Sequence, residues 1–382
     1  MWHSRARWVL GVAVLILLAP AAGQAREYPS ELGTVQVTTL LTGLEHPWSL
    51  AFLPDRQSLL LTERPGRLRL ATLEGELSEP IVGVPKVFAR GQGGLLDVAL
   101  SPDFARDRWV YLAYAERRDG PNAGTAVGRG RLSADNRRLD DFEVIFRQQP
   151  KLSTGVHFGS RLVFDRSGHL FITLGENNQR PTAQALDKLQ GKVVRLRRDG
   201  RVPSDNPFVG QPGARPEVWS YGHRNPQGAA LNPWTGQLWI HEHGPRGGDE
   251  INIPRAGRNY GWPIATHGID YTFLPIPEAR GKVVPGTEPP HYVWAKSPAI
   301  SGMAFYDAER FAPWQHSLFI GALAGRALIR LSLSGDEVVH EERLLESLAA
   351  RIRDVRQGPD GYLYLLTDSD NGRLLRLGLQ PK

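Results

Sequence analysis

Short apolar stretches recur six times along the chain, and each is broken by a turn. One copy consists of an apolar strand, a turn that carries Asp, Pro or Gly, and a second strand with apolar residues at alternate positions. Turns of the PD, SG, TG and DG type between β-rich runs are typical of hairpins. The copies begin at Ser49, Asp97, Arg161, Ala230, Met303 and Asp354.

Six such units at irregular spacing predict an all-β fold, a six-bladed β-propeller with long inter-strand loops. Helical periodicity is confined to two short segments, 183–189 and 341–350, and the polar segment 116–139 is predicted to be a loop at a blade edge. Gly and Pro are abundant, at 41 and 29 residues, as loops between blades require. A two-sheet sandwich or a pair of β domains is the alternative fold.

The N-terminus has the pattern of a secretory signal. Arg5 and Arg7 precede an apolar run over 8–22, which is followed by Gly23-Gln24-Ala25. The run is shorter than the ~20 apolar residues of a membrane span. We therefore predict a signal peptide over residues 1–25, a single propeller domain over 26–382 and a periplasmic location. An uncleaved N-terminal anchor is the alternative, and no later segment is expected to insert stably into a membrane.

Composition argues against nucleic acid as a partner. Loss of the signal lowers the formal net charge from +6 to +4, and Lys and Arg are scattered rather than striped, so nucleic acid is not expected. Cysteine is absent, so an exported chain must be stabilised by a large core or a bound metal instead of disulfides. Either a monomer or a homodimer is compatible with these features.

Four polar clusters each precede or enter a predicted blade, which would bring them together at one end of the propeller axis. One of them contains His157, flanked by Gly155 and Gly159. A neutral imidazole accepts a hydroxyl proton near neutral pH, so His157 is the candidate general base. The clusters are GQGG at 91–94, VHFG at 156–159, GHRN at 222–225 and RIRD at 351–354.

Three arginines in these clusters are candidates for binding carboxylates. Arg224, Arg351 and Arg353 have the planar guanidinium that pairs bidentately with a carboxylate. Ion pairing at the surface with Asp354 or Asp360 is the alternative role. That role explains one arginine more easily than three, so we expect an anionic ligand.

The segment 241–250, HEHGPRGGDE, is predicted to bind a hard cation. His241 and His243 would share one face of a strand with Glu242 opposite, and no third nitrogen or sulfur ligand is near, which disfavours zinc. The glycines, proline and carboxylates that follow supply oxygen ligands, which suit Ca²⁺. The chain has no phosphate-binding loop or dinucleotide fingerprint, so NAD, FAD and ATP lose support.

Six motifs stand in the order found in the soluble quinoprotein sugar dehydrogenases: GQGGLLDVALSPDF, HFGSRLVFD, GHRNPQG, EHGPRGGDEIN, NYGWP and RIRDV. From about Gly43 to Leu377 the chain resembles the glucose/sorbosone dehydrogenase family, and its aldose sugar dehydrogenase branch most. The resemblance implies a propeller that holds pyrroloquinoline quinone (PQQ) and Ca²⁺. It implies oxidation of the C1 hydroxyl of aldoses to lactones, with hydride transfer to PQQ and His157 as base. A quinone or redox protein would then accept the electrons.

The resemblance also assigns roles to individual residues. Glu176 falls on the acidic partner of the base, where the better-known glucose enzymes have Asp, and Arg224 joins these two in the catalytic group. A lysine that the family often places near the quinone falls on Ala324, with Arg326 as its candidate substitute. The implied cofactor-binding residues are Gln92, His157, Arg224, Asn225, His243, Tyr271, Ala324, Arg326, Arg351 and Arg353.

Two calcium positions are implied in the same way. The ion that touches the quinone would take backbone oxygens of Gly244 and Pro245, with Asp249 near by through water. A second, structural ion would lie near Glu250 and Tyr260.

Two other hypotheses remain open. A calcium-dependent propeller lactonase or related hydrolase would need several side-chain carboxylates around an ion in the channel. A non-catalytic propeller that acts as a binding module would need neither a base nor a cofactor. The excess of arginine over carboxylate favours the dehydrogenase, and the aromatic residues Trp262 and Tyr271 predict a shallow sugar site.

Overall fold

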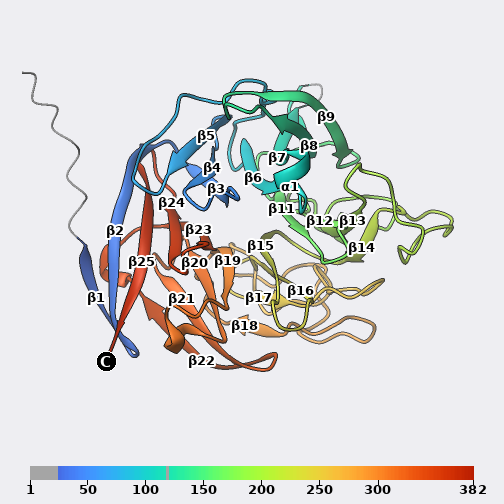
Figure 1. The fold of residues 1–382 in the computed structure, drawn as a ribbon. Coiled ribbons are helices and arrows are strands. Elements are labelled where there is room, and N and C mark those ends of the chain that lie inside the picture. The colour runs from blue at the N-terminus through green and yellow to red at the C-terminus, as the bar shows by residue number, and fades with distance from the viewer. Residues whose placement is uncertain (1–24, 118–119) are drawn as a thin grey trace, which may run out of the picture.

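The computed structural model describes residues 25–117 and 120–382, which form six antiparallel sheets around a central axis (Figure 1). The predicted six-bladed propeller is confirmed. Apart from Ala25, the predicted signal peptide lies outside the described residues. Within the described residues, no helix is long and apolar enough to cross a membrane.

Each sheet begins with a strand next to the axis, and each of the six sequence repeats starts on one of these inner strands. Neighbouring inner strands contact one another around a closed ring. The inner strands are β3 (Pro47–Phe52), β6 (Leu95–Leu100), β11 (Gly159–Phe164), β15 (Pro226–Leu231), β19 (Ile300–Tyr306) and β23 (Ile352–Gln357).

The outer strands complete the sheets. In the first three they are β4 (Ser58–Glu63) and β5 (Arg67–Thr72); β7 (Trp109–Arg117), β8 (Asn122–Leu132), β9 (Leu139–Arg147) and β10 (Leu152–Ser153); β12 (Leu170–Leu174), β13 (Lys192–Leu196) and β14 (Val218–Tyr221). In the last three they are β16 (Leu238–Glu242), β17 (Asp249–Asn252) and β18 (Tyr292–Trp294); β20 (Ser317–Ala322), β21 (Leu328–Ser334) and β22 (Glu337–Leu344); β24 (Leu363–Thr367), β25 (Gly372–Pro381), β2 (Gly33–Leu44) and β1 (Arg26–Ser30).

The ring is closed by strands from the two ends of the chain. β2 pairs with β25 along most of its length, with Val35 opposite Leu379 and Val37 opposite Leu377. All four side chains are buried in one apolar cluster with residues of β23 and β24. The first and last segments of the propeller are therefore held together by a continuous hydrogen-bonded ladder.

Three local predictions were wrong. Segment 341–350 begins in β22 and continues into a short 3₁₀ helix, Glu346–Leu348, because pairing with β21 satisfies its backbone. Segment 183–189 contains only the end of the 3₁₀ helix Arg180–Ala183. Segment 116–139 contains the 11-residue strand β8, which pairs with β7 and β9. The remaining short helices are α1 (Phe104–Asp107) and Ala312–Trp314.

A shift of register near the start of every inner strand directs side chains toward the axis. Pairing skips residues between Pro47 and Ser49 in β3, between Pro226 and Gly228 in β15, and at matching places in the other four strands. A bulge re-aims the side chain that it leaves unpaired. Three of the residues skipped in this way are Trp48, Gln227 and Arg353, and all three line the cavity described next.

Candidate active site

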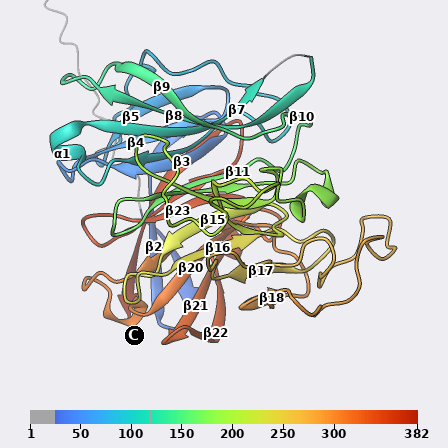
Figure 2. The same ribbon diagram turned by 90° about the vertical axis from the view of Figure 1, so that its right-hand side faces the viewer.

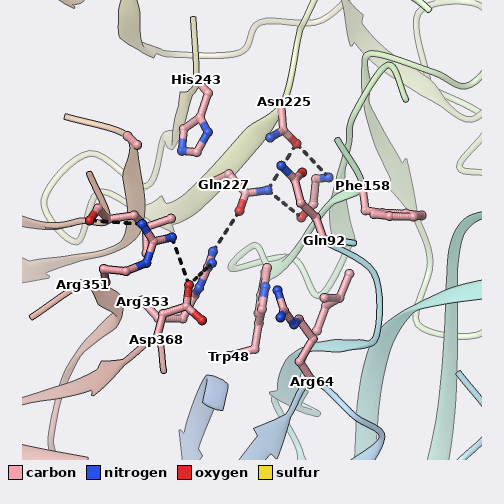
Figure 3. A pocket seen from close by; sticks show the side chains of 14 residues that line it. Trp48, Arg64, Gln92, Phe158, Asn225, Gln227, His243, Arg351, Arg353 and Asp368 are labelled. Atoms are coloured by element: carbon pink, nitrogen blue, oxygen red, sulfur yellow. Dashed lines mark hydrogen bonds and ion pairs between the residues drawn. The ribbon is translucent and has the colours of Figure 1, made fainter. Parts of the chain in front are cut away.

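A cavity of about 260 Å³ opens where the inner strands begin (Figure 3). It is mostly polar, with Trp48 and Phe158 as its aromatic residues. The lining residues are Trp48, Arg64, Gln92, Leu96, Phe158, Gly159, Asn225, Gln227, His243, Ala299, Leu323, Arg351, Arg353 and Asp368.

Five residues expected from the sequence line this cavity. They are Gln92, Asn225, His243, Arg351 and Arg353, which come from three different sheets or the loops next to them, while Phe158 and Gly159 come from a fourth sheet. The four polar clusters of the sequence therefore meet at one end of the axis, because each stands at the start of an inner strand.

His157 lies directly behind the cavity wall formed by Phe158 and Gly159. Its Nδ1 is 2.9 Å from Glu176 Oε1, and both side chains are buried. The side chain of Gln92 accepts a 2.8 Å hydrogen bond from the backbone N–H of His157, which fixes the segment. Within the described residues, His157 Nε2 has no hydrogen-bond partner, so this nitrogen is the one available to a ligand.

The surroundings of His157 favour the neutral imidazole. Burial and the charge of Arg224 lower the pKa of His157, and Glu176 only partly opposes them. A neutral ring with its Nδ1 beside a carboxylate keeps the Nδ1 proton there and leaves Nε2 as an acceptor. This arrangement has the form of a general base and its orienting partner.

Arg351 and Arg353 approach the same carboxylate, that of Asp368. Their Nη2 atoms lie 3.2 and 2.9 Å from Asp368 Oδ2 (Figure 3). Burial acts to raise the pKa of Asp368, but Arg353 and His46 outweigh it and hold the pKa well below its usual range. Arg353 also donates to Gln227, at 3.2 Å, while its buried Nε has no partner. The Asp368 carboxylate thus positions both guanidinium groups, and the Nε of Arg353 remains an unused hydrogen-bond donor.

Arg224 does not line the main cavity but stands behind His243. It donates to the His243 carbonyl at 3.1 Å, lies 5.4 Å from the centre of the Trp262 ring, and leaves its buried Nε without a partner. Its backbone N–H donates to Glu242, which also contacts His223 at 2.8 Å. Arg224 therefore acts on the site chiefly through its charge.

The structure adds a buried ion-pair cluster that the motif analysis missed. The guanidinium of Arg161 lies 2.9 Å from Asp354 and 3.3 Å from Asp97, and its Nε donates to the Gln227 carbonyl at 2.7 Å. Arg161 also stacks on Trp48, with 4.1 Å to the ring centre. Asp97, Arg161 and Asp354 each begin one of the sequence repeats. A charged residue at the start of an otherwise apolar repeat is the sequence signal that could have identified this cluster.

Arg64, Trp48, Gln227 and Asp368 were also missed. Arg64 is half-buried, and within the described residues its guanidinium has no hydrogen-bond or ion-pair partner. Gln227 belongs to the motif GHRNPQG but was given no role there, and no short motif distinguishes Arg64, Trp48 and Asp368. They reach the cavity through strand ends and bulges, which the sequence pattern does not reveal.

The 241–250 segment forms a tight loop between β16 and β17. Asp249 accepts hydrogen bonds from the backbone N–H groups of Gly244, at 3.0 Å, and Ile300, at 3.3 Å. The carbonyl oxygens of Gly244 and Pro245 accept no hydrogen bond from the described part of the chain. Backbone oxygens that are left free in this way fit a hard cation.

The surroundings of the second expected calcium are more mixed. Burial and the adjacent Glu242 raise the pKa of Glu250 well above its ordinary value, and Glu250 accepts from Asn252 at 2.9 Å. The Tyr260 hydroxyl is already satisfied by Ile253 and Arg255. Within residues 25–117 and 120–382, no group of three or more His, Cys, Asp or Glu side chains could hold a metal.

Three residues expected at the cofactor lie elsewhere. Tyr271 is 65% exposed on the long loop between β17 and β18. Ala324 and Arg326 are exposed next to the entrance. Arg326 lines a separate, open cavity of about 450 Å³ that shares Arg351 and Asp368 with the first.

Comparison with known proteins agrees with this geometry. Residues 44–376 match the Glucose / Sorbosone dehydrogenase family. The chain is 60% identical over 344 residues to Aldose sugar dehydrogenase YliI of Escherichia coli (strain K12), covering 90% of this chain and 93% of that protein. It is 30% identical over 293 residues to Quinoprotein glucose dehydrogenase B of Acinetobacter calcoaceticus, covering 68% and 60%.

Two solved structures are similar over almost the whole chain. The apo-form of the soluble aldose sugar dehydrogenase from Escherichia coli is 59% identical, with a TM-score of 0.89 and coverage of 91% of this chain and 100% of that one. The PQQ-bound form of aldose sugar dehydrogenase from Streptomyces coelicolor is 29% identical, with a TM-score of 0.75 and coverage of 92% and 100%.

Proposed function

The chain belongs to the glucose/sorbosone dehydrogenase family, and from that premise we propose that it oxidises the C1 hydroxyl of aldoses to lactones with PQQ as cofactor. It is an aldose sugar dehydrogenase by its similarity to enzymes of that activity. The observation that carries the finer proposal is a carboxylate-oriented histidine, His157, directly behind the wall of a cavity that is lined by a pair of arginines.

The residues of the cavity fit PQQ. The cofactor carries three carboxylates, and the cavity presents Arg64, Arg351 and Arg353 as cations, with an unused donor on Arg353. Trp48 and Phe158 provide apolar faces for the ring system. Gln92 and Asn225 supply amides for its oxygens, so we assign cofactor binding to this set together with Gln227 and His243.

When bound, PQQ supplies an ortho-quinone that accepts the hydride from C1, and Ca²⁺ supplies polarisation of its carbonyl. The protein moves the proton. His157 Nε2 takes it from the C1 hydroxyl, while Glu176 holds Nδ1–H and stabilises the imidazolium that forms. Burial and the charge of Arg224 lower the pKa of His157, which favours the neutral ring before the proton is transferred.

We propose that the carbonyl oxygens of Gly244 and Pro245 would hold the calcium ion. Asp249 supports this site through the hydrogen bond to the Gly244 amide, which holds the loop in shape. A calcium-dependent lactonase is less well supported. It requires several carboxylates around one ion, and the described residues offer no such cluster.

We propose that the signal peptide directs the enzyme to the periplasm, where it acts as a monomer or homodimer and passes electrons to a quinone or a redox protein. Substrate breadth provides the test. A panel of aldoses, simple alcohols and lactones is assayed on PQQ-loaded protein, with lactone identified as product. Aldoses should react and lactones should not, and a preference for simple alcohols with inert aldoses would overturn the proposal.

A further inference from the structure

Exposed apolar side chains concentrate on one loop of the propeller. Among the described residues, nine large hydrophobic side chains are exposed, and five belong to segment 269–283. Four stand close together in the stretch 269–274, which we call the finger. The five are Ile269, Tyr271, Phe273, Leu274 and Val283, and all but Ile269 are more than 60% exposed.

The finger is a built structure that projects from the molecule. It turns on itself through hydrogen bonds from Asp270 N to Leu274 O and from Phe273 N to Asp270 O, and Ile269 pairs with Arg246. Arg180 holds its flank through Asp270, at 3.2 Å. Figure 2 shows the loop between β17 and β18 extending beyond the sheets on the right.

The finger stands next to the active site. Thr266, three residues before it, lines a small cavity together with Arg224 and His243. A Cβ on Gly248 would lie 2.7 Å from the backbone of Gly268, so the base of the finger packs directly on the loop proposed to hold calcium. Because His243 also lines the main cavity, the base of the finger lies beside the active site.

Uncompensated positive charge surrounds the base of the finger. Arg246, Arg280 and Lys282 are exposed, and none pairs with a carboxylate in the part of the chain that the structure describes. The two acidic residues of segment 269–283, Asp270 and Glu278, share one arginine, Arg180, so together they leave a single negative charge beside these three cations. We call these three cations the collar, and one of them, Arg246, lies over the ring of Phe273 in the finger, 4.0 Å from the ring centre.

We propose that the finger and collar dock the enzyme on an anionic lipid surface. An apolar tip with aromatic residues suits the boundary between acyl chains and headgroups, and a ring of cations suits anionic headgroups. Docking would be peripheral, with no segment crossing the bilayer. It would hold the cavity mouth at the membrane, where a lipid-soluble electron acceptor resides. The docking itself does not depend on the catalytic chemistry.

Sedimentation of the mature protein with lipid vesicles tests the proposal. Binding is expected to vesicles of phosphatidylethanolamine with phosphatidylglycerol, and much less to phosphatidylcholine alone. Phe273→Asp and Leu274→Asp should each lower the partition coefficient about tenfold or more, because each loses one inserted side chain. Val82→Asp and Val339→Asp remove equally exposed apolar groups elsewhere and should change nothing. Asp tolerates the left-handed backbone of Phe273.

The collar is tested separately. The double variant Arg280→Gln/Lys282→Gln should lose about fivefold per cation on anionic vesicles and little on neutral ones. Dye-linked sugar oxidation in solution should be unchanged in all these variants, which shows that they fold. Absence of vesicle binding by the wild-type protein, or equal binding by Phe273→Asp, would overturn the proposal. A third outcome would also overturn it: the wild-type protein self-associates in light scattering, the finger variants do not, and neither binds vesicles. The finger would then bind a second copy of the chain.

Discussion

Glu176 Oε1 lies 2.9 Å from His157 Nδ1, with both side chains buried at the cavity wall. The pair makes His157 the expected base, so His157→Ala should lower kcat by about 10²–10⁴-fold. PQQ affinity, measured by absorbance titration, should be nearly unchanged because the arginines are elsewhere. His169→Ala, in the turn between β11 and β12 of the same sheet, is the control. Near-normal turnover of His157→Ala would show that another group takes the proton.

The acid limit of activity follows from the pKa of His157. Only the neutral ring accepts a proton, and burial and Arg224 lower its pKa from the ordinary value of 6.5. kcat/KM should therefore stay high below pH 6.5 and fall as the pH drops through the lowered pKa. Glu176→Gln removes a charge that raises this pKa, so its acid limb should move further down while the rate decreases. An acid limb above pH 6.5 in the wild-type enzyme would contradict this assignment.

The affinity for PQQ should depend on Arg353, which lines the main cavity, and not on Arg326, which lines the neighbouring one. Arg353 lines the cavity, so Arg353→Gln should weaken PQQ binding by about 1–3 kcal/mol, as for a lost charged hydrogen bond. Arg326 lines only the neighbouring cavity, so Arg326→Gln should have little effect. Fluorescence or absorbance titration of the apo-protein measures both. A larger loss for Arg326→Gln would show that Arg326 takes the role of the lysine replaced by Ala324.

Stability should depend on Lys192, a buried residue outside the active site. Its ammonium donates to the carbonyls of Thr182, Ala183 and Gln190 at 2.7–3.0 Å. Burial lowers its pKa to about 7 from 10.5, so above pH 7 the unfolded state holds more protons than the folded state. The free energy of unfolding should rise with pH between 7 and 10.5, by at most about 1.4 kcal/mol per pH unit.

Denaturant titrations of the wild-type protein and Lys192→Met check this dependence. The difference between their pH profiles isolates Lys192 from other titrating groups, such as Glu250. Lys192→Met should be less stable at neutral pH by about 1–3 kcal/mol, because three buried carbonyls lose their donor. Parallel profiles for the two proteins would mean that Lys192 keeps an ordinary pKa in the fold.

The sequence predicted the propeller because each blade repeats the same local pattern. Ser49, Asp97, Arg161 and Asp354 each mark an inner strand, and hairpin turns follow them. The helical periodicity of segment 341–350 was misleading, because a short run of charged and apolar residues fits either an edge strand or a helix. Pairing with β21, which is not a local property, decided for the strand.

The candidate site was predictable where glycine-flanked motifs precede a strand, as for Gln92, His157 and Asn225. Trp48, Gln227 and Asp368 were not predictable, because bulges and the meeting of different blades bring them to the cavity. Asp368 also changes the account of the arginines. The motif RIRD indicated free cations for an anionic ligand, whereas the structure gives Arg351 and Arg353 a shared internal carboxylate.

The most direct test of the central claim is cofactor dependence of sugar oxidation by the purified apo-protein. We expect dye-linked oxidation of aldoses when PQQ and Ca²⁺ are both added, and none with either one alone. Chelation of calcium before PQQ addition should prevent activity. Activity with NAD and no PQQ, or full activity in excess chelator, would contradict the account.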